Sequence, residues 1–208
     1  MPAGSRAKDN EAMPPITTAL IVANVAVYLL SSVTPGLVGP FALWPIGAGP
    51  EFRGAPGFAA WQLVTYAFLH GGLTHLLFNM FGLYMFGSPM EQVLGGRRYL
   101  FYYFTCVITA ALTQLAVQLL TGEFAPTVGA SGGVFGLLLG FAMLFPRQRI
   151  MLLIPPIPMS ARTFAIVYAV IELALGLYGS SSVAHFAHLG GMIGGFLLIR
   201  YWRLRAMG

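Results

Sequence analysis

The sequence predicts an all-α membrane protein with six transmembrane helices and both termini in the cytoplasm. Hydrophobic residues make up 57% of the 208 residues and charged residues only 8%, whereas a soluble domain carries about 25% charged residues. Six apolar runs approach the roughly 20 residues that a helix needs to cross a bilayer. Basic residues gather in segments that would lie on one side of the membrane.

The six apolar runs lie near residues 16–33, 73–94, 99–120, 130–146, 163–178 and 183–202. The third run contains no charged residue. The fourth has roughly sixteen apolar residues, about 24 Å of helix at about 1.5 Å per residue. Because the hydrocarbon core is about 30 Å thick, we expect this helix to begin below the outer surface.

The segments outside these runs divide into two tails and one long connection. Residues 1–15 are polar, and the run after them lacks a small-residue cleavage site, so we expect a cytoplasmic tail and a retained span. Residues 34–72 are too rich in Gly and Pro to span and too apolar for a free loop, which predicts an interfacial element outside the membrane. The six-helix domain then covers 16–203, and 204–208 form a second cytoplasmic tail.

Basic residues predict the orientation. Ten of the eleven Lys and Arg residues would lie on one side of the arrangement, and only Arg53 would lie on the other. Cytoplasmic loops are enriched in Lys and Arg, so both termini are expected to be cytoplasmic. The net charge of +5 then reflects topology, and we expect a lipid bilayer and no nucleic acid as partner.

Polar side chains inside a bilayer are costly, so each needs a partner or a function. Spans two, four and six place such groups near their outer ends: His75 and Asn79, Ser131, and His188. Asn79 lies about 9 Å and His188 about 7.5 Å along its helix, and Ser131 falls at a similar depth because its span starts low. The three sets therefore converge on one layer below the outer face.

Glycines allow spans four and six to meet in that layer. They recur every fourth residue in span four and follow the histidine of span six on its own helix face: Gly132, Gly136 and Gly140, then Gly191 and Gly195. Small residues at this spacing let membrane helices approach backbone to backbone. His188 is therefore expected within reach of Ser131.

A serine beside a histidine at this depth predicts nucleophilic acyl transfer. The hydroxyl is a weak nucleophile until a base, usually histidine, takes its proton. The oxyanion of the tetrahedral intermediate needs donors placed in advance. His75 and Asn79, an i,i+4 pair, offer side-chain donors, and the backbone N–H of Ser131 near a helix N-terminus offers another. Neighbouring glycines, including Gly129, let a substrate backbone approach.

These residues resemble the rhomboid family of intramembrane serine proteases. The matching motifs are GASG at Gly129–Gly132, HLLFN at His75–Asn79 and AHLGGMIGG at Ala187–Gly195. Each lies at the outer end of the corresponding span, in the family's order. The resemblance implies a six-helix rhomboid-like bundle that cleaves transmembrane protein substrates near the outer bilayer face, without a metal or cofactor.

The resemblance also implies a role for each matched position. Ser131 corresponds to the nucleophile and His188 to the base of a dyad that has no aspartate. His75 and Asn79 correspond to oxyanion-hole residues, and Phe135 to the ring that packs on the catalytic imidazole. The supporting positions are Gly129, Gly132, Phe135, Gly191 and Gly195.

Other polar residues carry separate expectations. Glu91 resembles a structural carboxylate at the inner end of span two. Glu172 is either functional or paired with Arg162 or a hydroxyl. His185 is expected to be a loop or packing histidine, with a role at the rim of the site left open, and His70 is expected to face the outer interface.

Three further expectations concern metal, aromatic residues and the one cysteine. His185 and His188 could share a metal, but no acidic or cysteine residue is expected beside them, which disfavours a metal site. The aromatic run at 99–104 is expected to face lipid. Cys106 is expected to be inert packing and, being alone, excludes an internal disulfide.

Two other functional classes stay open at this stage. A catalytically silent rhomboid-like protein would bind transmembrane helices without cutting them, and the intact Ser131, His188 and Asn79 argue against it. A small proton-coupled transporter would use Glu172 and the histidines, but the two halves of the chain show no inverted repeat. The oligomeric state is open, and in a bacterium the location would be the plasma membrane.

Overall fold

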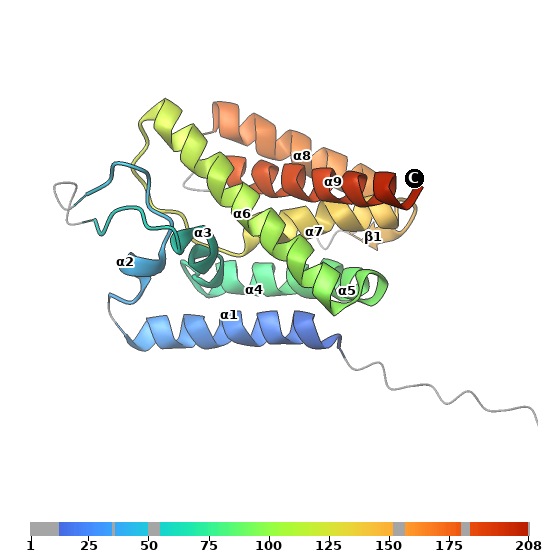
Figure 1. The fold of residues 1–208 in the computed structure, drawn as a ribbon, viewed down its shortest axis with the longest axis horizontal. Coiled ribbons are helices and arrows are strands. Elements are labelled where there is room, and N and C mark those ends of the chain that lie inside the picture. The colour runs from blue at the N-terminus through green and yellow to red at the C-terminus, as the bar shows by residue number, and fades with distance from the viewer. Residues whose placement is uncertain (1–12, 35, 50–54, 152–156, 180–183, 208) are drawn as a thin grey trace, which may run out of the picture.

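In the computed structural model, the described residues are 13–34, 36–49, 55–151, 157–179 and 184–207. Within them, six rod-like helical segments follow one another, and successive rods run in opposite directions (Figure 1). The rods are α1 (Pro15–Val33), α4 with η2 and α5 (Leu73–Gly82, Leu83–Gly87 and Ser88–Leu94), α6 (Gly96–Thr121), α7 (Ser131–Leu144), α8 (Ala161–Tyr178) and α9 (His185–Met207). They agree with the predicted apolar runs to within a few residues.

Three of the described helices, α1, α6 and α8, are long and apolar enough to cross a membrane. The apolar helix α7 has only 14 residues, in keeping with the short fourth run. The second rod is divided by η2, a π-helical turn of five residues. The predominantly helical class is confirmed, and the passage of all six rods through the bilayer stays a prediction.

The connection between α7 and α8 contains a small sheet that the predicted all-α class left out. Strands β1 (Arg149–Met151) and β2 (Pro158–Ser160) pair antiparallel, with Arg149 opposite Ser160. Proline lacks the backbone N–H that a helix interior requires, and Pro155, Pro156 and Pro158 fall in this connection. Extended backbone is therefore favoured here.

The predicted interfacial connection contains short helices, α2 (Val38–Phe41), α3 (Gln62–Thr65) and η1 (Tyr66–Phe68). The side chain of Gln62 holds this connection together by hydrogen bonds. The Gln62 Nε2 donates to the Gly57 carbonyl at 2.9 Å, and the Gln62 Oε1 accepts the Trp44 N–H at 3.1 Å. The side chain is buried, so these bonds replace water that it has lost. Arg53, which the orientation argument placed on the outer side, lies outside the described residues.

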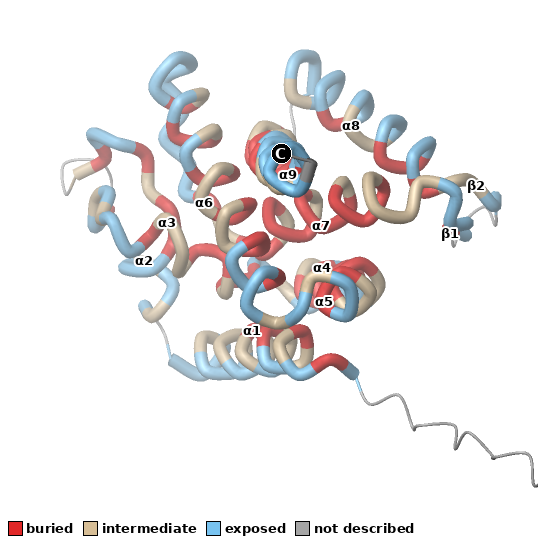
Figure 2. Tube along the Cα trace, turned by 45° about the vertical axis from the view of Figure 1, so that its right-hand side comes forward, coloured by how far each residue is buried: buried red, intermediate tan, exposed pale blue. Residues whose placement is uncertain are grey.

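Helix α7 lies at the centre of the bundle, and nine of its fourteen residues are buried (Figure 2). It packs against α4, α6, α8 and α9. A side chain added at Gly191 would collide with the Gly132 carbonyl oxygen, and one added at Gly136 would lie 2.9 Å from the Gly191 oxygen. Helices α7 and α9 therefore touch backbone to backbone, as the glycine spacing predicts.

The expectation that the aromatic run at 99–104 faces lipid is wrong for its tyrosines. Tyr99, Tyr102 and Tyr103 are fully buried, while Phe101 is exposed. The Tyr102 hydroxyl donates to the Gly136 carbonyl at 2.8 Å. Tyrosines on α6 thus fill the space beside the glycines of α7, and Cys106 is buried among them as expected.

Glu91 on α5 joins the second rod to the beginning of α1. Its carboxylate accepts the backbone N–H groups of Ile16 at 2.9 Å and Thr17 at 2.7 Å, and the Thr17 hydroxyl at 2.8 Å. The first N–H groups of a helix have no partner within it, and they favour a negative charge. Helix α1 begins at the same end of the molecule at which α9 ends (Figure 1), so the first and the last described helix termini lie on one side. The assignment of that side to the cytoplasm stays a prediction.

Candidate active site

Ser131, the first residue of α7, lies beside His188 of α9. The serine Oγ and the histidine Nε2 are 2.7 Å apart, and His188 is buried. Gly129, two residues before the serine, has a φ of 127°, a conformation that side chains rarely allow. The tight turn delivers the serine from the preceding loop directly into the first turn of the helix.

The ring of Phe135, one turn after Ser131, stacks on the imidazole of His188. Their ring centroids are 4.2 Å apart, and the ring planes differ by 4°. The contact brings together two residues that the sequence placed on separate helices. It holds the imidazole against the face of α7 on which the serine lies.

Glu172, from α8, lies beside the other nitrogen of the same imidazole. Its Oε2 is 2.8 Å from His188 Nδ1 and 2.7 Å from His185 Nδ1, and all three side chains are buried. The implied dyad without an aspartate assigned no role to this glutamate. Of the two alternatives for Glu172, the pairing with Arg162 or a hydroxyl is wrong, since the hydrogen bonds that the structure gives Glu172 join it to the two histidines.

Sequence reasoning missed this contact although a signal for it was present. Glu172 lies 13 and 16 residues before the two histidines, so helix-face spacing cannot relate them. The depth of Glu172 can relate them, because Glu172 precedes the outer end of α8 at Tyr178 by about 9 Å of helix. That is the layer of the serine and His188, where the histidines were the available partners.

The same three side chains contradict the reason for which the sequence disfavoured a metal site, namely that no acidic residue would lie beside the histidines. Glu172, His185 and His188 form a group of ligand-type atoms within 4.8 Å of one another, so an acidic residue does lie beside the histidines. The Nδ1–Oε2 distances of 2.7 and 2.8 Å are those of hydrogen bonds. Two ligands on one zinc ion, each about 2.0–2.2 Å from it in tetrahedral geometry, would lie more than about 3 Å apart.

His75 on α4 approaches the serine from the opposite side. Its Nδ1 accepts the Gly71 N–H at 3.3 Å, so a neutral ring carries its proton on Nε2. A side-chain atom added at Gly129 would lie 2.7 Å from that Nε2 and 3.7 Å from the Ser131 Oγ. The imidazole N–H and the serine hydroxyl therefore flank one small space, and a side chain at Gly129 would fill it.

Asn79 lies one turn after His75 and is buried. Its amide donates one hydrogen bond to the His75 carbonyl at 2.9 Å, and an amide nitrogen carries a second N–H. Both residues line the same cavity as Ser131 and His188. The structure thus brings together all four residues that the sequence singled out for chemistry.

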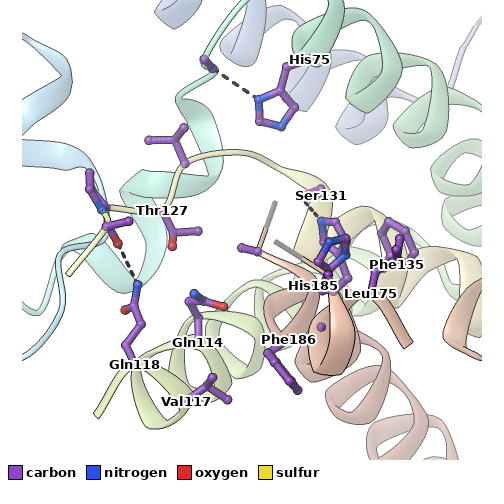
Figure 3. A pocket seen from close by; sticks show the side chains of 18 of the residues that line it. His75, Gln114, Val117, Gln118, Thr127, Ser131, Phe135, Leu175, His185 and Phe186 are labelled. Atoms are coloured by element: carbon purple, nitrogen blue, oxygen red, sulfur yellow. Dashed lines mark hydrogen bonds between the residues drawn. The ribbon is translucent and has the colours of Figure 1, made fainter. Parts of the chain in front are cut away.

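The cavity has a volume of about 960 Å³ and lies between α4, α6, α7, α8 and α9. Gln114 and Gln118 line it from α6, opposite His75 (Figure 3), and sequence reasoning did not assign them. Within the part of the chain that the structure describes, neither Gln Oε1 has a hydrogen-bond partner. Such groups favour water in the cavity, which hydrolysis inside a bilayer requires.

Of the two remaining histidines, only His70 differs from what was expected. His70 is buried and packs edge-on against His75, with 5.1 Å between ring centroids, rather than facing the outer interface. His185, the first residue of α9, is buried and lines the cavity.

Residues 57–205 match the family model of the Rhomboid domain. The chain belongs to the rhomboid family. Membership and the apolar helices together make it an integral membrane protein.

Three curated rhomboid proteins illustrate the similarity. Rhomboid protease GluP of Bacillus subtilis (strain 168) is 30% identical over 183 residues, which are 88% of this chain and 34% of GluP. Putative rhomboid protease YdcA of the same strain is 28% identical over 88% of this chain and 86% of YdcA. Rhomboid protease GlpG of Yersinia pestis (strain Pestoides F) is 28% identical over 92% of this chain and 63% of GlpG. This rhomboid chain therefore spans about a third of GluP and less than two thirds of GlpG.

Proposed function

We propose that this rhomboid chain is an intramembrane serine endopeptidase that cleaves transmembrane segments of other membrane proteins near the outer bilayer face. The observation that carries the proposal is the 2.7 Å contact between Ser131 Oγ and His188 Nε2. It lies in a cavity with polar lining between apolar helices. Three proteins with rhomboid protease in their names are similar to most of this chain.

The contact supports a two-step acyl transfer. Ser131 Oγ attacks the carbonyl carbon of the substrate while His188 Nε2 takes the hydroxyl proton. The C–N bond breaks as the same nitrogen returns the proton to the leaving amine. Water then attacks the acyl-serine ester while His188 Nε2 takes a proton from it. The C–O bond to the serine breaks as the same nitrogen gives that proton to Ser131 Oγ.

The oxyanion formed in each step needs donors that are already in place. The Nε2–H of His75, the second amide N–H of Asn79 and the backbone N–H of Ser131 are the proposed donors. The last belongs to the first turn of α7, where backbone N–H groups have no partner within the helix. The roles of Gly129 and Gly132 follow from space, because side chains there would meet His75 and Ala110.

Labelling with a fluorophosphonate tests the proposal without a known substrate. The reagent phosphonylates a serine whose hydroxyl is activated by a base. We expect labelling of the wild type in mild detergent at Ser131, located by mass spectrometry, and none for Ser131→Ala or His188→Ala with unchanged melting temperatures. Folded wild-type protein that resists the reagent would overturn the proposal in favour of a silent helix-binding relative.

The transporter alternative requires a carboxylate that is free to exchange protons along a path. Glu172 instead accepts hydrogen bonds from two histidines at one end of the bundle. This arrangement favours the hydrolytic function.

A further inference from the structure

We propose that Glu172 is a positioning residue for His188, the third member of a Ser131–His188–Glu172 relay. Its carboxylate keeps the proton of the neutral imidazole on Nδ1, so that Nε2 is free to take the proton of Ser131. It also stabilises the imidazolium that this transfer creates. The inference rests on the proposed hydrolytic function and adds a residue to it.

The direction of each hydrogen bond follows from the chemistry of the partners. A carboxylate can only accept, so the 2.8 Å contact between Glu172 Oε2 and His188 Nδ1 requires a proton on Nδ1. A neutral imidazole has a single N–H. Nε2 must then accept the Ser131 hydroxyl across 2.7 Å, which is the arrangement that a general base needs.

His185 holds the carboxylate in place for this task. Its Nδ1 lies 2.7 Å from the same Glu172 oxygen, and its ring stands at 89° to that of His188. A carboxylate oxygen accepts two hydrogen bonds, one at each lone pair. Because the two histidines are three residues apart on one face of α9, both donors reach Glu172 from a single rigid helix.

A comparison with Glu91 separates this role from an ordinary structural one. Both carboxylates are buried. Glu91 accepts from the backbone and hydroxyl groups at the start of α1, so it stabilises a helix end. The hydrogen bonds that the structure gives Glu172 come from ring nitrogens of the cavity, and one of those rings touches the nucleophile. An ionisable group within a membrane span is costly without such a function.

The matched substitutions Glu172→Gln and Glu91→Gln test the inference, because each removes a charge and keeps the shape. The amide that Glu172→Gln introduces can donate to His188 Nδ1, which moves the imidazole proton to Nε2 and disables the base. We expect Glu172→Gln to lower the fluorophosphonate labelling rate of folded protein at least about 10-fold, with little change in melting temperature. Glu91→Gln should lower the melting temperature and leave the labelling rate per folded molecule unchanged.

The tautomer of His188 gives a second readout that does not depend on activity. The chain has four histidines, so ¹⁵N-histidine spectra can be assigned by comparison with single variants such as His188→Ala. We expect Nδ1–H for His188 in the wild type and Nε2–H in Glu172→Gln. Nε2–H in the wild type, or labelling of Glu172→Gln at the wild-type rate, would overturn the inference. A folded wild type that is not labelled overturns the proposed function instead. The ¹⁵N spectra then test by themselves whether Glu172 sets the tautomer of His188.

Discussion

The ring of Phe135 and the imidazole of His188 stack almost parallel, with 4.2 Å between their centroids. Hydrogen-bond partners hold both nitrogens of that imidazole, Ser131 at Nε2 and Glu172 at Nδ1. The stack restrains the plane of the imidazole, and the two bonds restrain its rotation within that plane. His188 is thus held against turning away from the serine.

Replacing Phe135 tests how much the stack contributes. Phe135→Leu keeps apolar volume and loses the ring face, so we expect a decrease in labelling rate of up to about 10-fold, because such ring contacts contribute about 0.5–1.5 kcal/mol. Phe135→Tyr keeps the ring face and should retain more of the rate. Stopped-time labelling of the two variants at equal folded concentration makes the comparison; equal rates would contradict a role for the stack.

Asn79→Ala removes a proposed oxyanion donor. Loss of one such donor lowers the rate of serine hydrolases about 10²–10³-fold. We therefore expect Asn79→Ala to slow labelling by a large factor, though by less than Ser131→Ala does, with the fold intact. The phosphonyl oxygen occupies the oxyanion position, so labelling kinetics measure the effect. Leu77→Ala, an exposed neighbour on α4, serves as control. An Asn79→Ala rate equal to that control would remove Asn79 from the oxyanion hole.

Gly191→Ala tests the contact between α7 and α9. The new methyl group would strike the Gly132 carbonyl oxygen, and inserting a methyl group into a packed site costs about 1–3 kcal/mol. We expect a lower melting temperature in detergent together with weaker labelling, because the two helices carry the proposed nucleophile and the proposed base. Gly39→Ala, which has open space around it, should change neither. A Gly191→Ala protein as stable as this control would contradict the backbone contact.

Gln62→Ala tests the fastening of the outer connection. It leaves the Trp44 N–H and the Gly57 carbonyl, which are partly buried, without their partners. A fully buried polar group left unpaired costs about 1–3 kcal/mol, which is the upper limit for each of these two groups. We expect faster proteolysis between residues 36 and 61 than in Gln92→Ala, an exposed site on α5. Identical digestion of the two variants would show that other contacts hold the connection.

Depth and glycine spacing in the sequence were sufficient to bring Ser131 and His188 together. Both patterns are local, since each is counted along a single helix, and a membrane supplies the common frame that relates the helices. The resemblance added Phe135 as the stacking partner. Arguments of this kind do well wherever one helix face is marked by small or polar residues.

Glu172 and the tyrosines of α6 show where such arguments fail. The contacts of Glu172 depend on how α8 and α9 pack, and helix-face spacing within either sequence does not encode that. Composition does not show which way a side chain points on its helix. For that reason the aromatic run predicted lipid contact for Tyr99, Tyr102 and Tyr103. Their burial follows from missing side chains on neighbouring helices, since a Cβ at Gly87 would meet Tyr99, one at Gly140 would meet Tyr102, and one at Gly133 would meet Tyr103.

The π-helical turn η2 sets the phase of the second rod. A π turn holds one more residue than the α-helical turn that it replaces. If the same residues wound as an unbroken α-helix, the outer half that carries His75 and Asn79 would rotate by about 100° relative to the inner half that carries Glu91. No orientation of an unbroken α-helix of this sequence could then present the outer pair to Ser131 and the carboxylate to α1 at once. The extra residue in the π turn therefore lets one helical rod contact Ser131 and α1 on different sides of its axis.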